Sequence, residues 1–243
     1  MISVGFKTDR GKARSGNEDS VFVLPAEQLY IVADGVGGHN SGELASRMAV
    51  SYMAQYAALN PLSEIQDTAK LRDYFQNAVS GANQLIFTSA YKEAGHVGMA
   101  TTMVMCHLRE NKAYVVNVGD SRAYLLREGS LLQITKDHTW VNEMIDRGML
   151  TEQEAKDHPD KNMITKALGG EPTVSPDFFV FDTYPGDILI LCTDGLYGEV
   201  GEDYITEIAG KAKTMHRLSK ELVDEANRQG GKDNISVICI SIQ

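Results

Sequence analysis

The spacing of apolar residues along the chain predicts strands at the start, then two helices, then strands again. Residues 42–59 place apolar side chains at helical intervals, and a second helical stripe runs over about 64–91. Asn40 and Glu43 resemble a capping box at the start of the first helix. Short runs rich in Val, Ile, Phe and Tyr predict strands at 2–7, 20–24, 29–33, 101–108, 113–118, 123–126 and 131–134.

In the last hundred residues, a polar insert is followed by further strands and helices. A polar insert over about 140–170 has helical features, with Thr151 and Glu154 forming an internal capping box. Strands are predicted at 178–181, 188–191 and 235–242, and helices at about 203–213 and 217–229. The order is not a βαβ alternation, so we predict an α+β fold of largely antiparallel sheets covered by helices. The length and the absence of a Pro/Ser-rich linker predict one domain over 1–243.

Charge and composition narrow the classes of function. The chain has 23 Lys and Arg against 33 Asp and Glu, a net charge of -10, which disfavours a nucleic-acid partner. The same charge repels a phosphorylated substrate unless bound cations reverse the field locally. The three cysteines stand in apolar runs and form no CxxC pair, so buried, reduced thiols are expected. No leader and no long apolar segment is visible, and we expect a soluble cytoplasmic protein without a membrane contact.

Four aspartates stand beside Gly or Asn where a predicted strand begins or ends: Asp34, Asp120, Asp194 and Asp233. Each of them alone is an ordinary turn signal. Strand ends in a sandwich can converge, however, and converging carboxylates must either take up a proton or bind a cation. The cluster Glu18-Asp19 precedes another strand and could join them.

Ligands that are all oxygen select hard cations, which here means Mg²⁺ or Mn²⁺ rather than zinc. Two such ions, about 4 Å apart, can share a bridging water, lower its pKa and so provide a hydroxide for in-line attack at phosphorus. The cations would also remove the repulsion between this acidic chain and a phosphate group.

Two further side chains could take part. Arg14 precedes Glu18 by four residues, and its planar guanidinium suits phosphate oxygens, although an ordinary surface arginine is the alternative. His39 follows the glycine-rich residues 35–38 and could protonate the leaving alkoxide as a general acid. Its alternative is a histidine at a helix start that bonds the local backbone.

In order along the chain, these residues resemble the type 2C metal-dependent serine/threonine protein phosphatases in their compact bacterial form. The resemblance spans nearly the whole chain, and although each motif alone is weak, the ordered set is specific. The segments that carry it are TDRGKARSGNEDS (8–20), VADGVGGHNSGELAS (32–46), MATT (99–102), NVGDSRAYLLREG (117–129), QITKDHT (133–139), LCTDGL (191–196) and GGKDNISV (230–237).

The resemblance implies a four-layer α-β-β-α sandwich with two metal ions at one end and a flap insert at about 140–180. It implies that Asp34 bridges the two ions and that the carbonyl of Gly35 joins it on one of them. Asp194 and Asp233 would hold the other ion.

Further roles follow from the same resemblance. Glu18 and Asp19 would act directly or through water, and Asp120 would help to bind a third, weaker ion. Arg14 would bind phosphate and His39 would be the general acid.

The expected substrates are phosphoserine and phosphothreonine proteins, with a cognate serine/threonine kinase as the opposing enzyme, and the protein is expected to be a monomer. A dinucleotide-binding enzyme is a rival interpretation of residues 29–59, but the third glycine of its motif is missing. A pseudophosphatase that binds phosphoproteins without hydrolysing them is a second rival. A phosphatase of small phosphorylated metabolites is a third, which the sequence leaves open.

Overall fold

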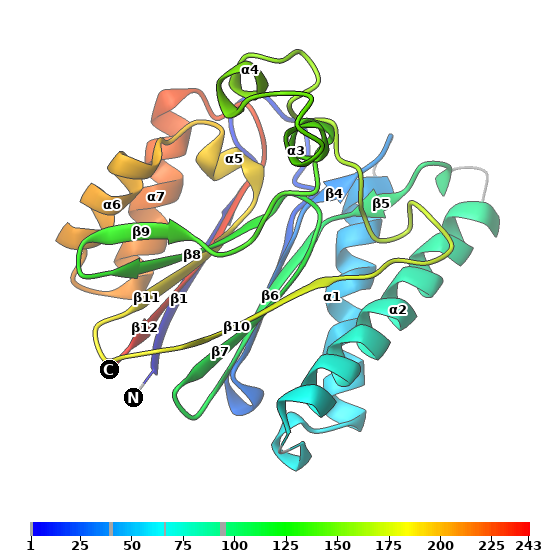
Figure 1. Ribbon diagram of the computed structural model, residues 1–243, viewed down its shortest axis with the longest axis horizontal. Coiled ribbons are helices and arrows are strands. Elements are labelled where there is room, and N and C mark those ends of the chain that lie inside the picture. The colour runs from blue at the N-terminus through cyan, green and yellow to red at the C-terminus, as the bar shows by residue number, and fades with distance from the viewer. Residues whose placement is uncertain (1, 39–40, 66, 93–95) are drawn as a thin grey trace.

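Two antiparallel sheets pack face to face, and helices cover both outer faces, so that the molecule has four layers (Figure 1). The structure is a computed structural model, and it describes residues 2–38, 41–65, 67–92 and 96–243. One sheet has the strand order β1-β12-β11-β8-β9 and the other β10-β7-β6-β3-β2. The predicted α+β sandwich is therefore confirmed.

The strands lie close to their predicted positions. The first sheet contains β1 (Ile2–Asp9), β12 (Ile235–Ile242), β11 (Ile188–Cys192), β8 (Arg122–Arg127) and β9 (Ser130–Gln133). The second contains β10 (Asp177–Asp182), β7 (Lys112–Val118), β6 (Met103–Arg109), β3 (Leu29–Ala33) and β2 (Ser20–Leu24), while β4 (Gly35–Val36) pairs with β5 (Ala100–Thr101). The predicted turn at Glu128 and Gly129 joins β8 to β9, and both residues have positive φ, 51° and 80°, as a two-residue hairpin loop requires.

Helices pack on each sheet because apolar side chains alternate across the strands. The second sheet is covered by α1 (Ser41–Leu59) and α2 (Thr68–Lys92), and the first by α5 (Asp194–Tyr197), α6 (Glu202–Lys211) and α7 (Met215–Gln229). In β3, Leu29 and Ile31 belong to the cluster under α1 and α2, whereas Tyr30 and Val32 lie between the sheets. The three cysteines are buried and free, as expected.

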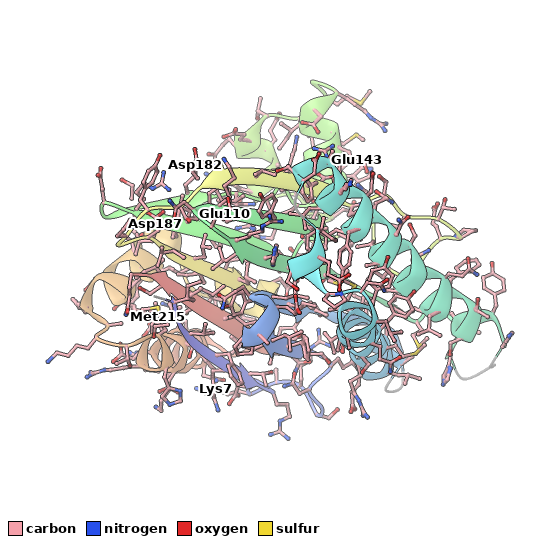
Figure 2. All side chains as sticks on the ribbon, turned by 90° about the horizontal axis from the view of Figure 1, so that it is seen from below. Lys7, Glu110, Glu143, Asp182, Asp187 and Met215 are labelled. Carbon is pink, nitrogen blue, oxygen red and sulfur yellow. The ribbon has the colours of Figure 1, made fainter. Side chains whose placement is uncertain are left out.

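Close packing fixes α7 against β1. A side chain at Gly5 would place its Cβ 2.1 Å from the Met215 backbone, so only glycine allows this approach. Met215 stands at the start of α7 beside β1 in Figure 2. The described residues also form two single turns of 3-10 helix, η1 (Pro25–Glu27) and η2 (Leu62–Glu64).

The insert differs from the prediction of a helical segment over about 140–170. It contains only two short helices, α3 (Trp140–Asp146) and α4 (Glu152–Lys156), followed by an irregular segment up to β10. Gly148, with φ of 69°, lies just beyond α3, and Pro159 disfavours helical backbone at the residue before it. The capping box of Thr151 and Glu154 is confirmed at the start of α4.

The predicted flap boundary of about 140–180 also needs correction, because β10 already belongs to the sheet from Asp177. The predicted cap at Asn40 lies outside the described residues. In the described part of the chain, no helix is long and apolar enough to cross a membrane.

Candidate metal centre

Five aspartates stand at strand ends on the same end of the sandwich. Asp19 directly precedes β2 and Asp34 directly follows β3, and these two strands pair in antiparallel register along their whole length. Asp194 lies just beyond β11 and Asp233 just before β12, which are also antiparallel neighbours. Asp120 follows β7, and the carboxylates lie within electrostatic range of one another. The predicted convergence of strand ends is confirmed.

The carboxylates are taken out of water together. Asp19 is 8% exposed, and the Thr193 hydroxyl donates to its Oδ2 at 2.9 Å, while its buried Oδ1 has no hydrogen-bond partner among the described residues. Burial raises the pKa of Asp19 to about 7, and the charges of Asp194 and Asp233 act in the same direction. Burial likewise raises the pKa of Asp34 well above its ordinary value, aided by the surrounding aspartates.

Asp194 repeats this pattern. Its Oδ1 is buried and lacks a hydrogen-bond partner within the described ranges, and burial followed by the charge of Asp233 raises its pKa. A buried anionic oxygen without a partner is costly unless a proton or a cation neutralises it. Oxygen donors of this kind fit Mg²⁺ or Mn²⁺.

Gly35 and Glu18 are held against each other by close backbone packing. A Cβ on Gly35 would lie 2.1 Å from the Gly42 carbonyl oxygen and 2.6 Å from the Glu18 carbonyl oxygen, so glycine is required there. A Cβ on Gly42 would in turn lie 2.4 Å from Glu18 Oε2. The carbonyl predicted to bind metal therefore belongs to a residue packed directly beside the Glu18 backbone.

Arg14 and Asp233 are paired with each other. The Arg14 Nη2 donates to Asp233 Oδ2 at 2.7 Å, and the two side chains are 52% and 33% exposed. The Arg14 guanidinium also lies within electrostatic range of Glu18 and Asp34. The guanidinium therefore stands at the edge of the carboxylate group and faces solvent, where an incoming anion can reach it.

Asp120 lies beside a separate network of polar contacts. It is 4% exposed, and burial, followed by the charges of Asp194 and Asp137, raises its pKa to about 7. The Tyr197 hydroxyl donates to the Asp120 carbonyl oxygen at 2.9 Å. The Arg122 guanidinium stacks 3.6 Å from the Tyr197 ring centre and binds both carboxylate oxygens of Asp137. These contacts fix the backbone at Asp120.

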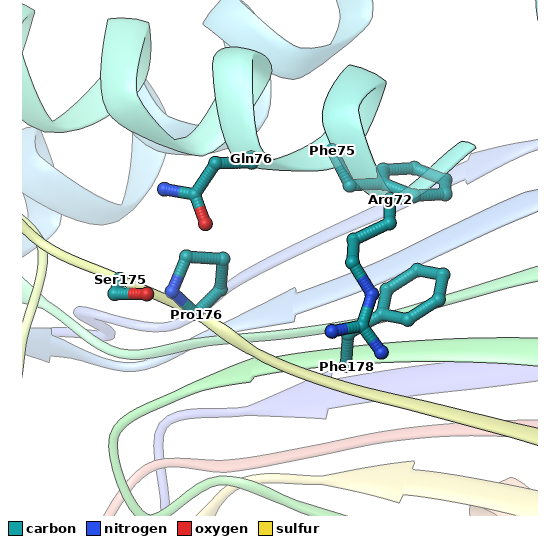
Figure 3. Close-up of a pocket in the computed structure, with 6 residues that line it drawn as sticks. All are labelled: Arg72, Phe75, Gln76, Ser175, Pro176 and Phe178. Atoms are coloured by element: carbon teal, nitrogen blue, oxygen red, sulfur yellow. The ribbon is translucent and has the colours of Figure 1, made fainter. Parts of the chain in front are cut away.

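Within the described ranges, no three Asp, Glu, His or Cys side chains lie close enough together to form a complete set of metal ligands. Two cavities lie away from this centre. One of about 120 Å³ lies between α2 and the segment before β10 (Figure 3), lined by Arg72, Phe75, Gln76, Ser175, Pro176 and Phe178. A second one, at the opposite end of the sandwich, includes Ile2 and Ile242. Neither contains any of the converging aspartates.

Three supporting residues were missed by sequence reasoning. Thr193 donates to Asp19 and accepts from the Ser236 amide at 3.0 Å, and Thr102 accepts from the Asp34 amide at 3.0 Å. Asn234 accepts from the Glu18 amide at 2.7 Å and donates to the carbonyl oxygens of residues 10 and 16 at 2.8 and 2.9 Å. For Thr193 and Asn234 the available signal was a polar residue next to an aspartate at a strand end, whereas Thr102 has no aspartate beside it in the sequence.

The comparison with known proteins agrees with this geometry. The family model described as Protein phosphatase 2C matches residues 10–233. The chain belongs to the protein phosphatase 2C family. The serine/threonine phosphatase stp of Listeria innocua is 36% identical over 97% of this chain and 94% of its own length.

Solved structures extend the similarity to the fold. The serine/threonine phosphatase of S. agalactiae superposes with a TM-score of 0.92 at 31% identity and covers 100% of both chains. The catalytic domain of the phosphatase PstP, in complex with two manganese ions, gives a TM-score of 0.84 at 33% identity, covering 99% of both chains. The present chain is accordingly a metal-dependent protein phosphatase, an enzyme rather than a dinucleotide-binding protein.

His39, the expected general acid, lies outside the described residues. The other predicted site residues, Arg14, Glu18, Asp19, Asp34, Gly35, Asp120, Asp194 and Asp233, all lie at the same end of the sandwich.

Proposed function

We propose that this phosphatase hydrolyses phosphoserine and phosphothreonine in proteins, with Asp34, Gly35, Asp194 and Asp233 as the main metal ligands. The observation that carries the proposal is the pair of buried carboxylate oxygens on Asp19 and Asp194 that lack a hydrogen-bond partner among the described residues and lie among further aspartates. Related phosphatases with this fold act on serine and threonine, which supports the same substrates here.

The chain's own residues would divide the remaining work. When bound, two divalent cations supply a water-derived nucleophile at neutral pH and neutralise negative charge on the phosphate. Arg14 would leave Asp233 and grip the phosphate oxygens, for which its planar fork is suited. Glu18 and Asp19 would order the centre directly or through water, and His39 would protonate the departing alkoxide.

Several finer assignments belong to the same proposal. The ions are Mg²⁺ or Mn²⁺, and Asp120, buried beside Asp194, would help to hold a third and weaker ion. We also propose that residues 1–243 act as one monomeric catalytic domain and that a serine/threonine kinase supplies the phosphorylated substrates.

The deciding experiment compares phosphothreonine-peptide hydrolysis with added Mn²⁺ and after exhaustive chelation. We expect turnover only with metal, and loss of turnover in Asp34→Asn with the folded structure preserved by circular dichroism. A chelated enzyme that retains full activity would refute the metal mechanism. Tight phosphopeptide binding without hydrolysis would instead support a pseudophosphatase, and hydrolysis of small phosphorylated metabolites alone would exclude a protein substrate.

A further inference from the structure

The loop over residues 10–16, called the basic loop here, carries cations at alternate positions in a chain with a net charge of -10. Arg14 is paired with Asp233. Arg10 and Lys12 are exposed, and neither forms an ion pair with a carboxylate in the described part of the chain. Among the described residues, the Arg10 side chain donates a hydrogen bond to the Ser15 carbonyl oxygen, at 3.4 Å.

The backbone of the basic loop is fixed against the metal centre. The amides of Lys12 and Ala13 donate to the Gly231 carbonyl oxygen at 2.7 and 3.1 Å, and the Asn234 amide group binds both ends of the loop. Gly11 has φ of +76°, and a Cβ there would lie 2.1 Å from the Asp233 carbonyl oxygen. The loop therefore holds Arg10 and Lys12 in a preorganised position beside Arg14 and Asp233, the two residues proposed to take part in function.

In the described part of the chain, the carboxylates near the basic loop bond to groups other than Arg10 and Lys12. Asp9 accepts from the Gly11 amide and from Asn227, and Glu199 pairs with Lys232 at 3.2 Å. Lys12 lies two residues from Arg14, so their Cα atoms are at most about 7 Å apart. An extended peptide advances about 3.3 Å per residue, so residues flanking a phosphate held by Arg14 fall within reach of Lys12 and Arg10.

We propose that the basic loop selects phosphorylated segments with acidic side chains next to the phosphorylated residue, an inference that rests on the proposed phosphopeptide activity. The net negative charge of the chain repels such segments, so the cations Arg10 and Lys12, which form no ion pair within the described ranges, favour their approach at this loop. Because both side chains are exposed, their contribution is modest and decreases with salt.

The test compares two phosphothreonine peptides that are identical except for flanking Glu or flanking Gln. We expect the wild-type enzyme with Mn²⁺ to favour the Glu peptide in kcat/KM by about fivefold at low ionic strength, mainly through KM. Lys12→Gln should lower this ratio about two- to threefold, and the Arg10→Gln/Lys12→Gln double variant should nearly remove the preference. Raising the salt concentration to about 0.5 M, where the Debye length is roughly 4 Å, should also nearly remove it.

Lys213→Gln is the matched control, because it changes the same charge at an exposed site before α7. The 15 residues of α7 place it about 22 Å from the Gly231 end of that helix. It should keep the wild-type ratio. If the wild-type enzyme has equal kcat/KM for the Glu and Gln peptides, or if the double variant keeps the wild-type ratio, this inference is overturned while the proposed function stands. Failure to hydrolyse either peptide would overturn the proposed function and, with it, this inference.

Discussion

Asn234 is the residue whose removal best tests how the centre is held together. The residue is 4% exposed, and its side-chain amide forms three hydrogen bonds of 2.7, 2.8 and 2.9 Å with the Glu18 amide and the carbonyl oxygens of Arg10 and Gly16. Asn234→Ala would leave all three backbone groups without these partners. We therefore expect loss of folding stability and displacement of Glu18 and the basic loop together.

The size of the effect follows from the number of bonds. Each neutral hydrogen bond contributes about 0.5–1.5 kcal/mol net, so losing three lowers the free energy of unfolding by about 2–4 kcal/mol. A typical domain has about 5–15 kcal/mol in total, so the variant should still fold. Asn234→Asp keeps the shape and one acceptor but cannot donate to the two carbonyl oxygens, so it should lose most of the same stability.

The assay is urea denaturation of the metal-free protein, followed by calorimetric titration with Mn²⁺. Asn60→Ala serves as the control, since its amide makes a single exposed hydrogen bond to the Tyr56 carbonyl oxygen. The control should change stability by less than about 1 kcal/mol and leave Mn²⁺ affinity unaltered. A loss below about 1 kcal/mol in Asn234→Ala, with wild-type Mn²⁺ affinity, would refute the reasoning.

The remaining predictions concern individual groups. Asp120→Ala should retain two tight Mn²⁺ sites in calorimetry but lower turnover, and loss of both tight sites would make Asp120 a main ligand. Arg14→Ala should raise KM for a phosphopeptide about thirtyfold, from a charge-assisted contact worth about 2 kcal/mol, whereas a collapse of kcat alone would place that contact in the transition state. His39→Ala should cost about 10²–10⁴-fold on a phosphothreonine peptide but far less on p-nitrophenyl phosphate, whose leaving group needs no proton; equal losses would remove it as the acid. Burial lowers the pKa of His107 to about 4, so the unfolded chain takes up a proton first as pH falls below 6.5, and the His107 contribution to stability should decrease by about 3 kcal/mol between pH 6.5 and 4. The buried aspartates act in the opposite direction, because their raised pKa values let the folded chain take up protons first. The free energy of unfolding of the wild type minus that of His107→Phe should therefore fall by this amount over that pH range, and a constant difference would contradict the assignment.

Local patterns were sufficient for most of the fold. Short apolar runs such as Leu29–Ala33 and Ile235–Ile242 predicted those strands with the observed bounds. The helical stripe of α2 was likewise visible in the sequence, although it begins at Thr68 rather than near residue 64. The insert was the exception, since Gly148 and the residues around Pro159 interrupt a pattern that otherwise suited a helix.

The sequence by itself determined which residue types could form the centre, because aspartates beside Gly or Asn at strand ends are visible one segment at a time. Only the tertiary structure decided which groups touch. Arg14 pairs with Asp233 across 219 positions, and Asn234 reaches the Gly16 carbonyl oxygen across 218. Such contacts depend on strand order and register, which arise when distant segments bury their apolar faces together, and no local periodicity encodes which strand ends become neighbours.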